Sequence, residues 1–130
     1  MSQTKISTWL LSTYLLYASC AGPDNLGQLN LKAWRNDRGG CKGQRAQLFN
    51  DFMAVRDQLK GIHSNNLGNM LGRPDVNQIT DRNQKLYVYY VEKGPQCGDN
   101  TGAKSNAKSV ALRVSAIGLV TEVTVQNGVP

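Results

Sequence analysis

The sequence predicts a single α+β domain in which two N-terminal helices pack on one face of a three-stranded antiparallel sheet, in the order α-α-β-β-β. Two observations lead to this fold class. Apolar residues recur at helical spacing in the first half of the chain, and three segments of the second half are rich in β-branched and aromatic residues. A length of 130 residues allows one core but not two.

Residues 44–60 predict the first helix. Their apolar side chains form one stripe along a helix, namely Leu48, Phe52, Val55 and Leu59. Gly61 is expected to end this helix, and Ser64 to cap a short second helix that carries apolar residues on one side. Gly72 and Pro74 end the second helix, since Gly followed by Pro is a common stop signal.

Three segments predict the strands: 85–92, 109–115 and 120–125. Side chains alternate between the two faces of a strand, which divides each segment into two sets. The set expected to face the helices is Leu86, Val88, Tyr90, Val110, Leu112, Val114, Val123 and Val125. The set expected on the opposite face is Tyr87, Tyr89, Ala111, Arg113, Ser115, Glu122 and Thr124.

The opposite face carries the candidate partner-binding residues Tyr87, Tyr89 and Arg113. Two tyrosines beside an arginine match the composition of binding hot spots. An ordinary amphipathic sheet surface accounts for the same residues, because tyrosine is a good strand former. Both interpretations are open at the level of sequence.

Residues 1–19 have the pattern of an export signal. Lys5 precedes a mostly apolar run over 6–18, whose 13 residues fall within the roughly 7–15 typical of signal peptides and below the roughly 20 that span a membrane. The segment Tyr17-Ala18-Ser19-Cys20 resembles a bacterial lipoprotein box, which implies that Cys20 carries lipid and becomes the mature N-terminus. Ordinary cleavage after Ala21 is the alternative.

The rest of the chain divides into three parts. Residues 20–33 are expected to form a flexible tether, because Pro, Gly, Asn and Asp interrupt them and no period holds. Residues 34–126 form the domain, with Trp34 expected at the edge of its core. Residues 127–130 are expected to be frayed.

The cysteine count favours one disulfide. If Cys20 carries lipid, Cys41 and Cys97 remain and can pair in an oxidising compartment. A disulfide between Cys41 and Cys97 would close the segment between them into a loop, which stabilises a chain by about 4 kcal/mol in the loop-entropy model. Two free buried thiols are the alternative. The sequence predicts no metal site and no cofactor, because a single histidine and two distant cysteines lack the spacing of metal ligands.

The charge pattern argues against nucleic-acid binding. The net charge is +6, but the basic residues are scattered, without the concentration and interleaved aromatics of such proteins. A solvated surface is the expected role, and attraction to an anionic surface is the alternative. The only histidine, His63, is expected to cap or to be exposed, since no nucleophile motif surrounds it. We therefore do not expect an enzyme.

Two motifs carry a family resemblance. Leu71-Gly72-Arg73-Pro74-Asp75 follows the second helix, and Gly118-Leu119-Val120-Thr121-Glu122-Val123 leads into the last strand. With the leader, they resemble the BamE (SmpA/OmlA) class of small outer-membrane lipoproteins over residues 44–126. That resemblance implies the architecture of this class and of the related β-lactamase-inhibitor-protein fold, two helices on an antiparallel sheet. The Cys41/Cys97 pair is a departure from the class.

The function that the resemblance implies is that of a lipid-anchored module of the bacterial cell envelope. It would be an outer-membrane lipoprotein facing the periplasm or the cell surface, and would bind or scaffold an envelope or outer-membrane protein in outer-membrane protein assembly or envelope integrity. No nucleic-acid partner is expected, and the oligomeric state is open. An inhibitor of a secreted hydrolase, as in the related inhibitor fold, is the alternative, and a small exported enzyme built on His63 is a third.

Overall fold

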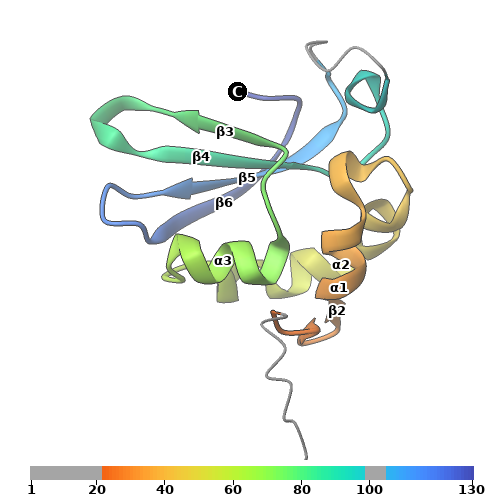
Figure 1. Ribbon diagram of the computed structural model, residues 1–130, viewed down its shortest axis with the longest axis horizontal. Coiled ribbons are helices and arrows are strands. Elements are labelled where there is room, and N and C mark those ends of the chain that lie inside the picture. Colours follow the sequence, from red (N-terminus) through yellow and green to blue (C-terminus); the bar gives the residue numbers. More distant parts are fainter. Residues whose placement is uncertain (1–21, 99–104) are drawn as a thin grey trace, which may run out of the picture.

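The computed structural model describes residues 22–98 and 105–130, which contain three α-helices and two antiparallel sheets (Figure 1). The elements are β1 (Asn25–Leu26), β2 (Leu29–Asn30), α1 (Leu31–Asn36), α2 (Gln44–Val55), α3 (Ser64–Leu71), β3 (Val76–Ile79), β4 (Lys85–Tyr90), β5 (Lys108–Val114) and β6 (Val120–Asn127). Short 3-10 helices follow α1 (η1, Arg38–Gly40) and α2 (η2, Arg56–Leu59), join β3 to β4 (η3, Asp81–Asn83) and follow β4 (η4, Pro95–Cys97).

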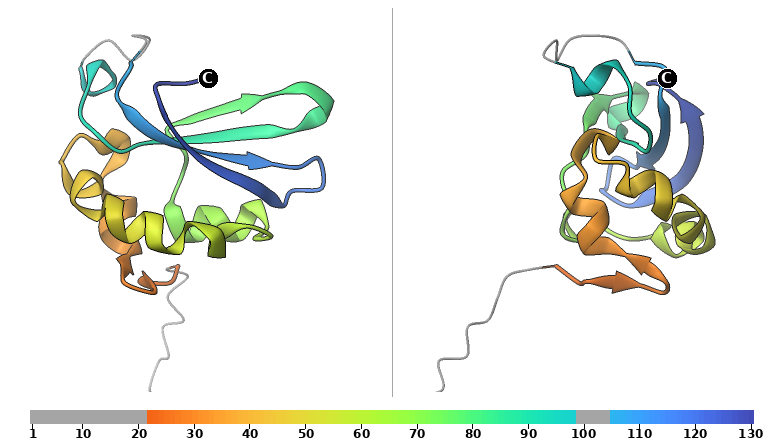
Figure 2. Two further views of the ribbon diagram at one scale, coloured as in Figure 1. Left: turned by 180° about the vertical axis from the view of Figure 1, so that it is seen from behind. Right: turned by 90° about the vertical axis from the view of Figure 1, so that its right-hand side faces the viewer.

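The larger sheet has the strand order β3-β4-β5-β6, and every neighbouring pair is antiparallel. It curves over the helices, which cover its inner face, while the β1–β2 hairpin lies beyond them (Figure 2). The main core fills the space between the two layers. It is made by Leu29, Leu31, Trp34, Phe52, Val55, Leu59, Leu67, Leu71, Tyr89, Val91, Val110, Leu112, Val114, Val120 and Val123.

The expected architecture of two helices on a three-stranded sheet is wrong in its number of elements. The sheet has a fourth strand, β3, and a further helix, α1, precedes the two that were expected. The sequence of β3, Val-Asn-Gln-Ile, has weak strand propensity because asparagine is depleted in strands. Antiparallel pairing with β4 stabilises this segment as a strand despite its weak propensity. Helix α1 is only six residues long, and its Leu31 and Trp34 side chains are buried in the core.

The two expected helices are present with small differences at their ends. The first ends as α2 at Val55 and continues to Leu59 only as the tighter turn η2. The second begins at Ser64, but its cap is His63, whose Nδ1 accepts a hydrogen bond from Asn65 N at 3.2 Å. Imidazole thus takes the role that the sequence pattern assigned to the serine hydroxyl.

Most of the expected tether is part of the folded domain. Residues 25–30 form the β1–β2 hairpin, and Leu29 and Leu31 are fully buried in the main core. The Asn30 side chain caps α1 by accepting from Ala33 N at 3.0 Å. The polar residues of this segment therefore serve a tight turn and a helix cap, which is why they show no period.

The face of β4 that packs against the helices is not the one expected from the sequence. Tyr89 stands opposite Val110 in the register, and residues that face each other across two strands share a face. Tyr89 is fully buried in the main core, and Tyr87, two residues away, packs against the same core. The expected placement of Leu86, Val88 and Tyr90 on the helix side is therefore wrong, since alternation puts all three on the face opposite Tyr89.

The physical reason is that the segment KLYVYYVE is apolar on both faces. Strand alternation specifies a register only where one face is polar. In β4, a hydrogen bond favours the face that carries Tyr89: the Tyr89 hydroxyl donates to Gly72 O at 2.8 Å on the helix side of the sheet. In β5, alternation was informative, and Val110, Leu112 and Val114 face the core as expected.

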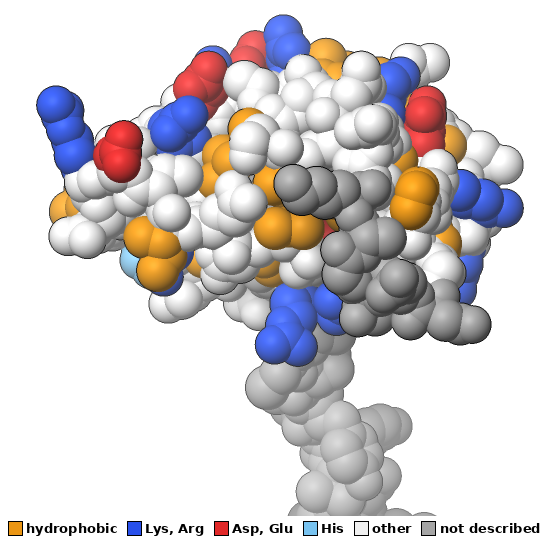
Figure 3. All heavy atoms as spheres, turned by 90° about the horizontal axis from the view of Figure 1, so that it is seen from above, with side chains coloured by type: hydrophobic (Ala, Val, Ile, Leu, Met, Phe, Trp, Pro, Cys, Tyr) orange, Lys and Arg blue, Asp and Glu red, His pale blue; other side chains and the backbone are white. Residues whose placement is uncertain are grey.

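The outer face of the sheet carries a second, smaller cluster. It consists of Leu86, Val88 and Ala111, with Val76 and Val129 packed against them. Figure 3 looks onto the side of the molecule opposite α3 and the β1–β2 hairpin, where apolar side chains show between polar ones and charged side chains gather toward the rim. The C-terminal residues are held here rather than frayed, since Gly128 N donates to Ala107 O at 2.8 Å.

Gly40 allows η1 to approach the sheet. Its φ is +68°, and a Cβ at this position would lie 2.9 Å from Tyr90 O and from the Val91 carbonyl carbon. Gly61 has a similar φ of +82°, but a Cβ there would meet nothing within 4 Å. The two glycines therefore separate the effect of backbone strain from that of close packing.

We expect Gly61→Ala to lower the free energy of unfolding by about 1–2 kcal/mol, the value of left-handed backbone strain alone. Gly40→Ala should lower it clearly further, because β4 and η1 must also move apart. Urea unfolding of the two variants beside the unmodified protein measures the difference. Equal losses in both variants would show that η1 does not depend on this close approach.

Candidate functional site

Arg45 is the centre of a buried polar network beneath the sheet. Its side chain is 1% exposed, although it lies on α2 among apolar neighbours. Its Nη1 donates to Asp75 Oδ2 at 2.8 Å and to Tyr90 O at 3.0 Å, and its Nε donates to Trp34 O at 3.0 Å. One guanidinium thus joins three segments that are distant in sequence, because its fork of donors matches several acceptors at once.

Asp75 balances the Arg45 charge and also orders the main chain around it. Its carboxylate accepts from Tyr90 N at 2.8 Å and from Gly39 N at 3.0 Å. Asp37, which is fully buried, accepts from Lys42 N at 2.6 Å and from Arg45 N at 2.8 Å. Since α2 has no capping side chain at its own N-cap, Asp37 satisfies one amide of its first turn, that of Arg45, from outside the helix.

Aromatic rings surround the Arg45 guanidinium. Its Cζ lies 5.1 Å from the centroid of Trp34 and 5.5 Å from that of Tyr89, within the range of cation–π contacts. Trp34 stacks in turn on Phe52, with centroids 4.8 Å apart and an interplanar angle of 13°. Trp34 is fully buried and therefore occupies the middle of the core rather than its edge.

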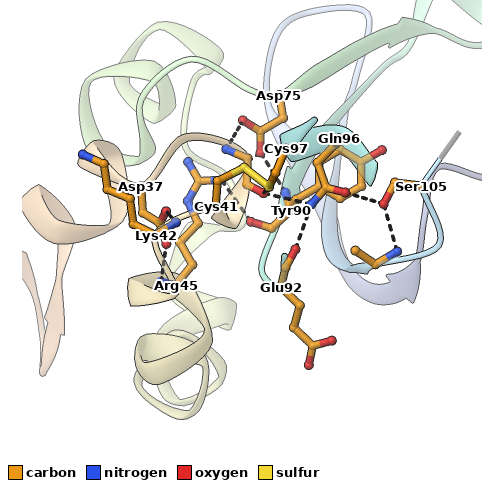
Figure 4. Close-up of a disulfide and its surroundings, with 12 residues drawn as sticks. Asp37, Cys41, Lys42, Arg45, Asp75, Tyr90, Glu92, Gln96, Cys97 and Ser105 are labelled. Atoms are coloured by element: carbon orange, nitrogen blue, oxygen red, sulfur yellow. Dashed lines mark hydrogen bonds and ion pairs between the residues drawn. A yellow bond between two sulfur atoms is a disulfide. The ribbon is translucent and has the colours of Figure 1, made fainter. Parts of the chain in front are cut away.

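The disulfide between Cys41 and Cys97 lies next to this network (Figure 4). It joins the segment before α2 to the segment after β4 across a sequence separation of 56, with the Cα atoms 5.6 Å apart. Gln96 Nε2 donates to Gly39 O at 3.0 Å and to Glu92 O at 2.8 Å, which holds η4 against η1. The same junction is thus secured by a covalent bond and by hydrogen bonds.

The structure does not bring Tyr87, Tyr89 and Arg113 together on one exposed face. Tyr89 is buried in the main core and Tyr87 is half-buried against it. Arg113 stands opposite Leu86 on the outer face, where its Nε lies 3.5 Å from Glu122 Oε2. The common surface on which these three were to act as partner-binding residues is therefore absent from the arrangement.

The edge of β6 is a candidate binding feature of the sheet. Strand β6 is the last strand in the order and is eight residues long. Within residues 22–98 and 105–130, main-chain hydrogen bonds cover this edge at the beginning of the strand, where Gly61 N donates to Val120 O at 2.7 Å and Val120 N donates to Ile62 O at 3.0 Å. Beyond that point, Val125 is 37% exposed.

The alternation of main-chain hydrogen bonds identifies the free groups of this edge. The Val88 carbonyl accepts from the residue that precedes β3, at 2.9 Å, so Val88 bonds away from β5. Its neighbour in β5, Ala111, consequently bonds toward β6, where it stands opposite Thr124. The N–H and C=O groups of Val123 and Val125 therefore point away from the sheet.

The opposite edge, β3, is short and flanked by charge. It has four residues and turns into β4 through η3, where Arg82 and Asn83 adopt positive φ values. Lys85 is exposed at the start of β4. Short edges with lysine nearby resist the addition of a further strand. The two edges of the sheet thus differ in their capacity for strand addition.

His63 lies in the turn between η2 and α3 and makes an isolated bridge to Leu119. Its Nδ1 is engaged in capping, so its role is local. Within residues 22–98 and 105–130, no three His, Cys, Asp or Glu side chains are placed to hold a metal ion. No helix in that part of the chain is long and apolar enough to cross a membrane. Cys20, the expected lipidation residue, lies outside the described residues.

The buried ion pair was missed by sequence reasoning, although one signal for it exists. Arg45 precedes Leu48 by three residues and Phe52 by seven, so it lies on the apolar stripe of α2. A lone arginine at a core position predicts a buried partner, since a charge is rarely buried unpaired. Asp75 carries no comparable signal, because it follows Gly72 and Pro74 in a segment without periodicity.

No protein-family model, curated protein or solved structure matches this chain. The resemblance to the BamE class therefore stays a prediction that depends on the two short motifs. The structure gives one of them a physical role: Leu71-Gly72-Arg73-Pro74-Asp75 ends α3 and delivers Asp75 to Arg45. That role concerns stability and is independent of any family.

Asp75→Asn should lower the free energy of unfolding by about 3–5 kcal/mol, because it leaves the Arg45 charge buried without a counterion. Asp81→Asn is the matched control, since Asp81 is exposed in η3 and should change stability by less than about 0.5 kcal/mol. Urea unfolding at neutral pH measures both. A loss in Asp75→Asn as small as in the control would show that the pair contributes little.

Alkaline pH should destabilise the fold through Tyr89. Burial raises the pKa of Tyr89 well above its ordinary value, although nearby Arg45 acts in the opposite direction. In the unfolded chain this phenol ionises near pH 10. As the pH rises above about 10, ionisation of this phenol therefore stabilises the unfolded state relative to the folded state. The free energy of unfolding, which is at its full value below that pH, decreases.

Tyr89→Phe should be less stable than the unmodified protein by about 1 kcal/mol at pH 7, through loss of the hydrogen bond to Gly72 O. Above about pH 10 its stability should fall less steeply with pH. Part of the slope should remain, because burial and Asp75 also raise the pKa of Tyr90. Denaturant unfolding across alkaline pH tests this, and parallel curves for the two proteins would contradict it.

Proposed function

We propose that this chain is an exported, lipid-anchored protein of the bacterial cell envelope that binds another envelope protein by strand addition at β6. The observation that carries the binding mode is the free edge of β6, with the outward main-chain groups of Val123 and Val125. An extended peptide adds to such an edge through main-chain hydrogen bonds and gains specificity from alternate side chains.

The composition of β6 favours this mode over a side-chain patch. The strand contains no proline and no lysine, and its only charged residue is Glu122. The Glu122 carboxylate is engaged with Arg113 at 3.5 Å on the outer face. Natural proteins usually protect a long edge with lysine, proline or a covering loop, and the described part of the β6 edge lacks these beyond Val120.

The expected chemistry of the partner follows from the two faces of β6. A strand added along Val123 and Val125 would place alternate side chains on the inner side, beside the half-exposed Val125. The intervening side chains would lie on the outer side, near Thr124 and the Arg113–Glu122 pair. The partner segment is therefore extended, apolar at alternate positions and polar between them.

The disulfide and the leader support the compartment in this proposal. A disulfide that secures a small domain is typical of proteins outside the reducing cytoplasm. The lipoprotein-like segment ending at Cys20 supplies the expected anchor. A role in outer-membrane protein assembly or envelope integrity rests on the BamE resemblance alone.

Val125→Pro should abolish partner binding with little loss of stability. The Val125 N–H points away from the sheet, so proline removes a donor for the added strand and leaves the β5–β6 ladder intact. The measurement is capture of partners from detergent-solubilised native envelopes, with mass spectrometric identification. Thermal unfolding reports the stability of the variant.

Two matched variants control for folding. Val125→Thr keeps a β-branched residue and the free N–H, and it should retain both stability and capture. Thr124→Pro removes an N–H that bonds inward to β5, so it should lower the melting temperature strongly. Capture of the same partner by Val125→Pro at unchanged yield would rule out strand addition at β6.

A further inference from the structure

The residues just after Cys20 are fastened to the helices. Arg35 Nη1 donates to Pro23 O at 2.7 Å and to Asn69 O and Met70 O at 3.2 and 3.1 Å. A methyl group at Gly22 would collide with Asn69 O, so the Gly22 backbone lies directly against the end of α3. The chain is therefore part of the domain from its first described residue.

This attachment limits how far the domain can stand from a lipid on Cys20. Two Cα–Cα steps separate Cys20 from Gly22, and these span at most about 8 Å. The sequence had predicted a tether of 14 residues that would let the domain move clear of the membrane. Since residues 25–30 form a hairpin and Leu29 and Leu31 are buried, that freedom is lost.

The elements next to Gly22 form one end of the molecule. Figure 1 places β2, α1 and α3 together at the end opposite the C-terminus, and Figure 2 shows the same arrangement from two other sides. We call the outer side of the β1–β2 hairpin, α1 and α3 the anchor surface. The four-stranded sheet lies on the other side of the helices.

The charges of the anchor surface suit an anionic bilayer. Lys32 is exposed on α1. Arg35, three residues later, is only 19% exposed, because its guanidinium is bonded to three main-chain oxygens. Residues 64–71 of α3 contain no charged side chain. The only acidic residue of the hairpin and its lead-in is Asp24, and Arg35 lies 3.9 Å from it. Basic side chains close to an anionic surface attract it.

We infer that the anchor surface lies directly on the bilayer, with Lys32 toward anionic lipid headgroups, when Cys20 is acylated. This inference rests on the proposed function, because it needs the lipid anchor, and it adds the orientation of the domain. The sheet then points away from the membrane, and the β6 edge is presented to other envelope proteins from a fixed height.

The labelling rate of single lysines tests this orientation. The acylated protein is placed in vesicles of phosphatidylethanolamine and phosphatidylglycerol and treated with a membrane-impermeant amine reagent. Modification is followed by peptide mass spectrometry at Lys32, on the anchor surface, and at Lys85, which is also exposed but lies at the β3–β4 turn. The reference is a variant with a flexible Gly/Ser spacer of about 20 residues between Ala21 and Gly22, whose root-mean-square length is about 25 Å.

We expect Lys32 to be modified several-fold more slowly in the unmodified chain than in the spacer variant, and Lys85 at equal rates in both. Equal rates at Lys32 in the two acylated proteins would overturn the orientation and leave the proposed function standing. Slower modification of Lys85 instead would overturn it as well, since the sheet would then face the bilayer.

The intact mass of the protein from its native envelope separates the two proposals. A mass that begins at an acylated Cys20 retains the premise, and the lysine rates then decide the orientation. A mass that begins after Ala21 without lipid removes the anchor from the proposed function and overturns the orientation with it.

Discussion

The ion pair between Arg45 and Asp75 is the interaction on which the rest of the fold depends. It joins α2 to the segment that leads from α3 into the sheet, and the same two side chains bind both main-chain groups of Tyr90. A buried pair of this kind contributes modest net stability, but removing one partner is strongly destabilising. The hydrogen bonds that Arg45 and Asp75 make therefore favour one arrangement of helices and sheet.

The disulfide and the ion pair act on the same junction by different means. The bond between Cys41 and Cys97 reduces the entropy of the unfolded chain, whereas the Arg45 network orders the folded one. The junction lies at the α2 end of the sheet, away from the β3–β4 turn (Figure 1). The β6 edge beyond Val120 takes no part in either restraint, which leaves its main-chain groups available to a partner.

Strong local patterns were sufficient for some elements and insufficient for others. Helices α2 and α3 and strands β4, β5 and β6 were predictable because each has a clear period or composition. Strand β3 and helix α1 were not, since a four-residue strand of Val-Asn-Gln-Ile and a six-residue helix obtain their stability from neighbours. The surface expected to carry Tyr87, Tyr89 and Arg113 together was not predictable for a related reason. Strand β4 is apolar on both faces, so Tyr87 and Tyr89 were assigned to the wrong side of the sheet.

The sequence by itself determined the pairing of Cys41 with Cys97 as the favoured alternative and the core faces of α2 and β5, because these follow from periodicity and composition. It indicated helices packed on an antiparallel sheet but gave the wrong number of helices and strands. Only the tertiary structure decided which face of β4 packs against the helices, that Arg45 meets Asp75, and that residues 22–33 belong to the domain. Each of these depends on contacts between segments distant in the chain. Such contacts leave no local period, because a hydrogen bond to Gly72 O or a carboxylate beside Arg45 selects one arrangement among several that the pattern allows equally.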